Sequence, residues 1–161
     1  MKIEAPLTVH RETVRPEWID YNGHMNVAYY LMAADHAMDA FGGLIGIGES
    51  YVQATNKSTF ALDTRIIYLR ELVSDAPFRV TAQLVAFDAK RLHVCLHLLH
   101  GAEGWISALS EWVLVHVDHY YVFHQALEPQ LFFLVKRHRH RRYPPYLSRQ
   151  RNLVVRHPYF S

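Results

Sequence analysis

Hydrophobic residues change their spacing along this chain, from a helical pattern in residues 27–41 to a strand pattern after residue 58. The first of these segments is rich in Ala, Leu and Met, and its only formal charges are Asp35 and Asp39, one helical turn apart. Such a composition predicts one long helix that is buried on most of its sides. Gly42 and Gly43 are expected to end this helix, and the segment that follows them is expected to be a loop.

Four later segments alternate apolar and polar residues with the period of two that is typical of strands. They cover residues 59–72, 78–87, 91–100 and 105–117. Short turn-forming stretches separate them, so we expect an antiparallel meander. Upstream of the helix, residues 7–19 are extended in character, and Pro16 suits an edge or irregular strand. One long helix packed on one antiparallel sheet makes an α+β fold.

Charge is distributed unevenly over the 161 residues. Residues 1–118 contain nine Lys and Arg against 14 Asp and Glu, whereas residues 119–161 contain eight against one. We therefore expect one folded domain over residues 1–118 and a basic C-terminal extension over residues 119–161. The basic run at 136–142 could attract nucleic acid, but a solvated extension is the preferred interpretation.

Several classes of protein are not expected from this composition. A single cysteine cannot form an intrachain disulfide, which favours a reducing compartment. No stretch approaches the ~20 apolar residues of a membrane span, and the N-terminal segment has no apolar core of a secretory signal. We therefore expect a cytoplasmic protein without a membrane anchor.

The segment before the helix carries the clearest motif, Trp-Ile-Asp-Tyr-Asn-Gly-His-Met-Asn at residues 18–26. Asn-Gly is strong turn chemistry, and Asn26 can cap the helix. The motif resembles the entry segment of hotdog-fold thioesterases of the 4-hydroxybenzoyl-CoA thioesterase type. The matching positions are Asp20, Gly23, His24, Met25, Asn26 and Tyr30. Weaker matches at 67–72, 88–93 and 115–118 extend the resemblance over about residues 7–118.

Within that family, residues 18–25 look most like the thioesterase domain associated with carnitine dehydrogenases, which is linked to betainyl-CoA hydrolysis. The resemblance implies a hotdog fold, hydrolysis of a small acyl-CoA and no cofactor. It also implies a homodimer or homotetramer in which two sheets pair side by side and the active sites lie between subunits.

A thioester carbonyl needs a nucleophile or an activated water, together with hydrogen-bond donors for the developing oxyanion. Asp20 is the candidate nucleophile or general base. By the family pattern, a backbone N–H near Val27 polarises the carbonyl, and Gly23 allows close backbone approach. His24 is either a second catalytic group or a residue that orders the loop, and Asn26 is either a cap or a catalyst.

Other side chains are candidates for contacts with the substrate. They are the aromatic residues Trp18, Tyr21 and Tyr30, the acidic and hydroxyl residues Asp35, Ser58 and Thr59, and the basic residues Lys57, Lys90 and Arg91. Each also has a simpler explanation in packing, structural hydrogen bonding or solvation. No metal is expected, because His100 does not share a strand face with His93 and His97.

Two alternatives keep the hotdog fold. One is a non-catalytic acyl-CoA-binding module, which does not need a carboxylate at Asp20. The other is a dehydratase or hydratase. Those enzymes have a loop led by a His and an acid on the helix, and His24 and Asp35 could mimic these two features. An α/β-hydrolase thioesterase is not expected, because the chain has no Gly-x-Ser-x-Gly segment.

Overall fold

The computed structural model describes residues 6–118 of the chain. The elements, in chain order, are β1 (Leu7–Thr13), the 3-10 turn η1 (Pro16–Trp18), α1 (Val27–Leu44), α2 (Glu49–Thr55), β2 (Lys57–Tyr68), β3 (Pro77–Phe87), β4 (Arg91–His100) and β5 (Ile106–Asp118). The predicted basic extension at 119–161 lies outside the described residues.

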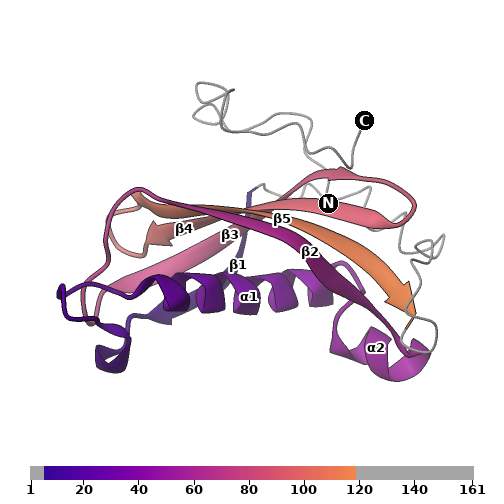
Figure 1. The fold of residues 1–161 in the computed structure, drawn as a ribbon, viewed down its shortest axis with the longest axis horizontal. Coiled ribbons are helices and arrows are strands. Elements are labelled where there is room, and N and C mark those ends of the chain that lie inside the picture. The colour runs from indigo at the N-terminus through magenta and orange to yellow at the C-terminus, as the bar shows by residue number, and fades with distance from the viewer. Residues whose placement is uncertain (1–5, 119–161) are drawn as a thin grey trace.

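The five strands form one antiparallel sheet in the order β1-β3-β4-β5-β2. Helix α1 runs along one face of this sheet, and the short helix α2 lies at one end of it, near the start of β2 (Figure 1). The structure therefore confirms the predicted α+β class, with one long helix on an antiparallel sheet.

The predicted four-strand meander is wrong in one respect. Only β3, β4 and β5 follow one another as hairpin neighbours, whereas β2 pairs with β5 from Lys57↔Asp118 to Tyr68↔Ala108. The periodicity of single segments does not predict this strand order, because the order depends on which edge of the sheet β2 reaches after α1. The consequence is that β2 is an edge strand of the sheet over its full length.

Helix α1 begins as the sequence predicts, with the side chain of Asn26 accepting a hydrogen bond from the Ala28 N–H at 3.0 Å. It differs from the prediction at its other end, since it continues through both glycines to Leu44. A Cβ atom on Gly48 would lie 2.8 Å from the Gly43 Cα. The glycines therefore permit close approach of the helix end to the next segment. Gly48 is the N-cap residue of α2, a helix that was not predicted from the sequence.

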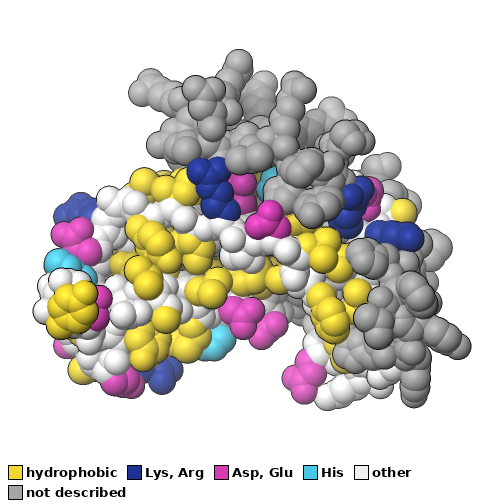
Figure 2. Space-filling view, in the orientation of Figure 1, with side chains coloured by type: hydrophobic (Ala, Val, Ile, Leu, Met, Phe, Trp, Pro, Cys, Tyr) yellow, Lys and Arg dark blue, Asp and Glu magenta, His cyan; other side chains and the backbone are white. Residues whose placement is uncertain are grey.

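Burial of α1 is also narrower than expected. One face packs on the sheet through residues such as Ala33, Ala37 and Phe41, while Val27 and Leu31 are exposed on another face. The sheet covers only one side of the helix, and Figure 2 shows hydrophobic side chains exposed on the face of the molecule where α1 and β2 lie. Among the described residues, no helix is long and apolar enough to cross a membrane.

The core between α1 and the sheet is formed by the alternate residues predicted from the strand periodicity. The two central strands contribute Phe78, Val80, Ala82 and Leu84 from β3 and Leu92, Val94, Leu96 and Leu98 from β4. Pairing of Val80 with Leu98 and of Ala82 with Leu96 keeps both rows on the same face of the sheet.

The opposite face of the sheet carries buried titratable groups, among them Cys95 and His97. The Cys95 Sγ lies 3.5 Å from the His97 Nε2. Burial and the nearby carboxylate of Glu111 raise the pKa of the Cys95 thiol to about 12, and burial lowers the pKa of His97 to about 4. The thiol is therefore protonated and unreactive, and the imidazole is neutral, at physiological pH.

The free energy of unfolding should consequently fall as the pH falls from 6.5 towards 4. In this range the unfolded chain binds a proton at His97 and the folded protein does not. The loss at this position amounts to about 3 kcal/mol. Urea unfolding at pH 7 and pH 4.5 checks it, and His97→Gln should show a smaller difference between the two pH values. An identical difference in wild type and variant would contradict this assignment.

Candidate active site

Asp20 lies in a tight turn directly before α1. Its backbone N–H donates to the His24 carbonyl at 3.0 Å, and its carbonyl accepts from the Gly23 N–H at 3.0 Å. Gly23 has a φ of 80°, which a residue with a side chain rarely adopts. The Asp20 Oδ1 accepts a hydrogen bond from the Asn22 N–H at 2.8 Å. This leaves the Oδ2 atom without a recorded protein partner in residues 6–118.

The start of α1 adjoins this turn. Asn26 uses its side chain as the helix cap and its backbone N–H to bind the Trp18 carbonyl at 2.8 Å. Among the described residues, no hydrogen bond is recorded for the N–H of Val27, the first residue of the helix. An uncapped N–H at the positive end of a helix is suited to bind a carbonyl oxygen that gains negative charge.

The structure gives different environments to the other predicted residues near this turn. Trp18 is buried and stacks on Tyr29 at 5.2 Å between ring centroids, with the Arg15 guanidinium over its ring. Tyr30 is buried, and its hydroxyl accepts a hydrogen bond from the Leu72 N–H. Both have packing contacts, whereas Tyr21 is 98% exposed.

The His24 ring is partly exposed, and no hydrogen bond to it is recorded within residues 6–118. Its backbone carbonyl, by contrast, closes the Asp20 turn. The backbone of His24 therefore holds the turn, and the role of its imidazole stays a prediction.

A second group of predicted residues meets beside the middle and the C-terminal half of α1. Asp35, Asp39 and Thr59 line a hollow that is open to solvent. Its other lining residues are almost all apolar, namely Met38, Phe41, Gly42, Ile45, Ile47, Ala61, Leu92, Trp112 and Leu114. No hydrogen bond or ion pair is recorded for either aspartate within the described part of the chain. Two carboxylates thus stand over an apolar floor that contains two aromatic rings.

Sequence reasoning did not include Asp39 among the candidate site residues. Asp39 lies one turn after Asp35 in an otherwise apolar helix, and this spacing was the signal that could have identified the pair. Ser58 pairs with Val117 on the opposite face of β2 from Thr59, so the structure does not bring it to the hollow.

The three basic residues that were predicted to contact the substrate lie at the ends of strands. Lys57 begins β2, and Lys90 and Arg91 lie at the turn between β3 and β4. Asp88 accepts hydrogen bonds from the backbone of both turn residues and from the Arg91 side chain. Burial acts to raise the pKa of Asp88, but the hydrogen bonds from Arg91 and the turn backbone outweigh it and lower the pKa. Arg91 is therefore committed to Asp88, and Lys90 is the more exposed of the two basic residues.

The Asp20 turn lies at the start of α1, whereas the acidic hollow lies beside its middle and its C-terminal half. With a rise of 1.5 Å per residue, Asp35 lies about 12 Å and Asp39 about 18 Å along the helix from Val27. Within one copy of the chain, Asp20 and the two helix aspartates therefore lie too far apart to contact the same small acyl group.

This helix-on-sheet arrangement is the hotdog fold implied by the motif at residues 18–26. The model of the family described as the Thioesterase-like superfamily matches residues 14–126, so the chain belongs to that superfamily. It is a thioester hydrolase, in agreement with the expectation from the sequence.

Curated relatives include a betainyl-CoA thioesterase from Pseudomonas aeruginosa, 39% identical over 112 residues that cover 70% of each chain. A bifunctional L-carnitine dehydrogenase/betainyl-CoA thioesterase from Agrobacterium fabrum is 35% identical over 119 residues. That match covers 73% of this chain and 24% of the relative, so the chain spans about a quarter of the length of the longer protein.

Solved structures agree with the fold. A candidate thioesterase from Pseudomonas putida superposes with a TM-score of 0.72 at 34% identity, covering 88% of this chain and 92% of that one. A Staphylococcus aureus protein in complex with CoA superposes with a TM-score of 0.77 at 24% identity, covering 90% of this chain and 96% of that one.

Proposed function

We propose that this protein hydrolyses betainyl-CoA, or an acyl-CoA with a similarly small cationic acyl group, to CoA and the free acid in the cytoplasm. The observation that carries this choice of substrate is the acidic hollow beside α1, in which Asp35 and Asp39 stand over an apolar floor. The betainyl-CoA thioesterase at 39% identity supports the same substrate class.

The hollow suits a trimethylammonium group for two physical reasons. Such a group has apolar methyl surface and a positive charge that it cannot share through hydrogen bonds. Its methyl groups favour an apolar and aromatic floor such as Phe41 and Trp112, and its charge favours nearby carboxylates and ring faces. An uncharged acyl group of the same shape would gain only the contact of its methyl groups with the apolar floor.

Hydrolysis itself is proposed to take place at the Asp20 turn. The Asp20 carboxylate takes a proton from a water molecule, and the water oxygen forms a bond to the thioester carbonyl carbon. The Val27 N–H stabilises the negative charge on the carbonyl oxygen. The carbon–sulfur bond then breaks, and the CoA thiolate receives the proton. Direct attack by Asp20, followed by hydrolysis of an anhydride, would use the same groups.

A second copy of the chain is proposed to complete the site. In betainyl-CoA a single CH2 separates the carbonyl carbon from the ammonium nitrogen, yet Asp35 and Asp39 lie about 12 and 18 Å along α1 from Val27, the residue beside the Asp20 turn. Edge-to-edge pairing of β2 with the β2 of a twofold-related copy sets the two α1 helices antiparallel. The hollow of one copy would then approach the Asp20 turn of the other. The exposed apolar residues Val27 and Leu31 on α1 are the surface expected to meet in such a dimer.

A matched pair of substrates tests the proposal. Betainyl-CoA and 3,3-dimethylbutanoyl-CoA have the same shape, because a carbon atom replaces the ammonium nitrogen in the second. The wild-type kcat/KM, measured by release of free CoA thiol, should be at least ~10-fold higher for betainyl-CoA, since one charge contact or cation–π contact contributes roughly 1 kcal/mol or more.

The double variant Asp35→Asn/Asp39→Asn provides the control for charge. It should lose most of the preference for betainyl-CoA and keep its kcat/KM for the uncharged analogue. Equal rates with both substrates in the wild-type protein would contradict a cationic acyl group and leave thioester hydrolysis itself in place.

A further inference from the structure

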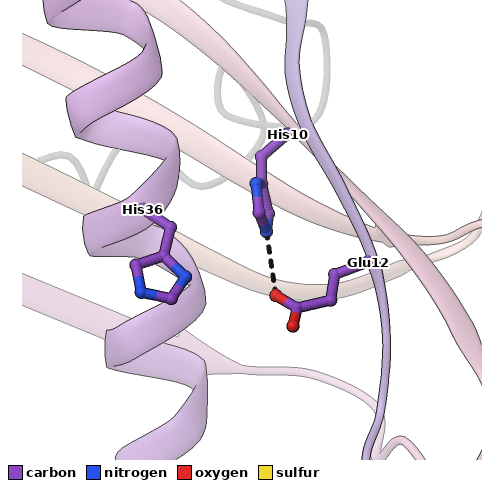
Figure 3. Close-up of side chains that lie close together, drawn as sticks. All are labelled: His10, Glu12 and His36. Atoms are coloured by element: carbon purple, nitrogen blue, oxygen red, sulfur yellow. Dashed lines mark hydrogen bonds and ion pairs between the residues drawn. The ribbon is translucent and has the colours of Figure 1, made fainter.

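Two histidines and a glutamate lie together on the side of α1 that faces β1. His10 and Glu12 are alternate residues of β1, so their side chains share one strand face. The His10 Nε2 lies 3.1 Å from the Glu12 Oε2. His36, from the middle of α1, points toward both (Figure 3), with its ring centroid 5.8 Å from that of His10. One ligand atom from each residue can be chosen so that all three lie within 4.8 Å of one another.

The proposed thioesterase reaction uses none of these three side chains. They belong to neither the Asp20 turn nor the acidic hollow, and the predicted sites do not include them. No local pattern indicates this cluster, because Glu12 and His36 are 24 positions apart and only the packing of β1 on α1 brings them together.

We propose that His10, Glu12 and His36 form a binding site for Zn2+, with water in the fourth position. Two imidazoles and one carboxylate are a known ligand set for tetrahedral zinc. Bonds of about 2.0–2.2 Å place the ligand atoms of such a site roughly 3.3 Å apart. His10 and Glu12 already have this spacing, and His36 is on the exposed surface of the helix, where its ring can turn to close the third side.

Arg15 sets the expected strength of the site. Its guanidinium binds the Glu12 Oε1 at 2.6 Å, which favours the ionised carboxylate, and the other oxygen, Oε2, faces His10. The same positive charge opposes a bound cation, which predicts moderate affinity rather than the tight binding of a closed structural zinc site. Bound zinc would connect the edge strand β1 to α1 and stabilise the folded protein.

The test is a titration of the full chain with Zn2+ after removal of metals by a chelator. Five further histidines lie at residues 119–161, so the result is read as a difference between variants. His36→Ala and His10→Ala should each lose one equivalent of bound Zn2+ or bind it at least ~10-fold more weakly. His100→Ala, which removes a histidine outside the cluster, should bind like the wild type.

A second measurement separates the site from other zinc-binding groups. Zn2+ should raise the melting temperature of the wild-type protein and of His100→Ala, and should not raise that of His36→Ala. His36 is exposed, so its loss is compatible with folding, which circular dichroism checks. The proposal would be overturned if His36→Ala bound as many equivalents of Zn2+ as the wild type and showed the same rise in melting temperature.

Discussion

Replacement of Asp20 by asparagine should reduce kcat for betainyl-CoA by at least ~100-fold, the effect of removing a general base or nucleophile. Asparagine has nearly the same shape as aspartate, and its side-chain oxygen can still accept the hydrogen bond from the Asn22 N–H. The turn before α1 should therefore stay folded while the proton acceptor is lost. Release of free CoA thiol, measured at saturating substrate, reads out the effect.

A matched control for this variant is Glu17→Gln. Glu17 is an exposed carboxylate three residues upstream, in η1, and has no recorded hydrogen bond or ion pair within residues 6–118. It should keep wild-type kcat. Full activity in Asp20→Asn would place the reaction elsewhere, and loss of activity in Asp35→Asn with retention in Asp20→Asn would identify the helix carboxylate as the reacting group.

Introduction of a charge at the edge strand should separate the proposed dimer. Leu62 lies at the irregularity of register in the edge strand β2 and is 44% exposed. Lysine on an edge strand opposes pairing with another strand, because its ammonium group resists burial. Leu62→Lys should therefore change the mass measured by light scattering from dimer to monomer. Activity on betainyl-CoA should fall at least ~10-fold with it, because a monomer lacks the charge contacts of the partner's hollow.

Val73→Lys is the control for this experiment. Val73 is also an exposed hydrophobic residue, at 52%, but it lies in the segment between β2 and β3, outside the sheet edge. It should stay dimeric and active. A wild-type protein that is monomeric and fully active would contradict the shared site.

The sequence predicted the elements of this fold better than their arrangement. The Asn26 cap and the alternating residues of β3 and β4 are local signals, and the structure confirms them. The position of β2 beside β5 and the continuation of α1 through Gly42 and Gly43 depend on contacts between distant segments. Helix α2 has only seven residues and none of them is buried, so it leaves almost no periodic signal.

The same distinction holds for the candidate site. The Asp20 turn is encoded in consecutive residues, and its Asn-Gly chemistry predicted a turn that the structure contains. The acidic hollow combines Asp39 from α1, Thr59 from β2 and Trp112 from β5, which no local pattern relates. The motif also contains Trp18, whose stacking on Tyr29 joins residues 11 positions apart and is not a feature of the motif itself.

A mixed dimer tests the central claim most directly. One subunit carries Asp20→Asn and the other carries Asp35→Asn/Asp39→Asn, and the mixed species is isolated through two different affinity tags. If Asp20 of one copy acts on an acyl group held in the hollow of the other, one of the two sites is intact. Hydrolysis of betainyl-CoA should then reach about half of the wild-type rate, although each parent homodimer is impaired. A rate no higher than the mean of the two parent homodimers would contradict a site completed between two copies of the chain.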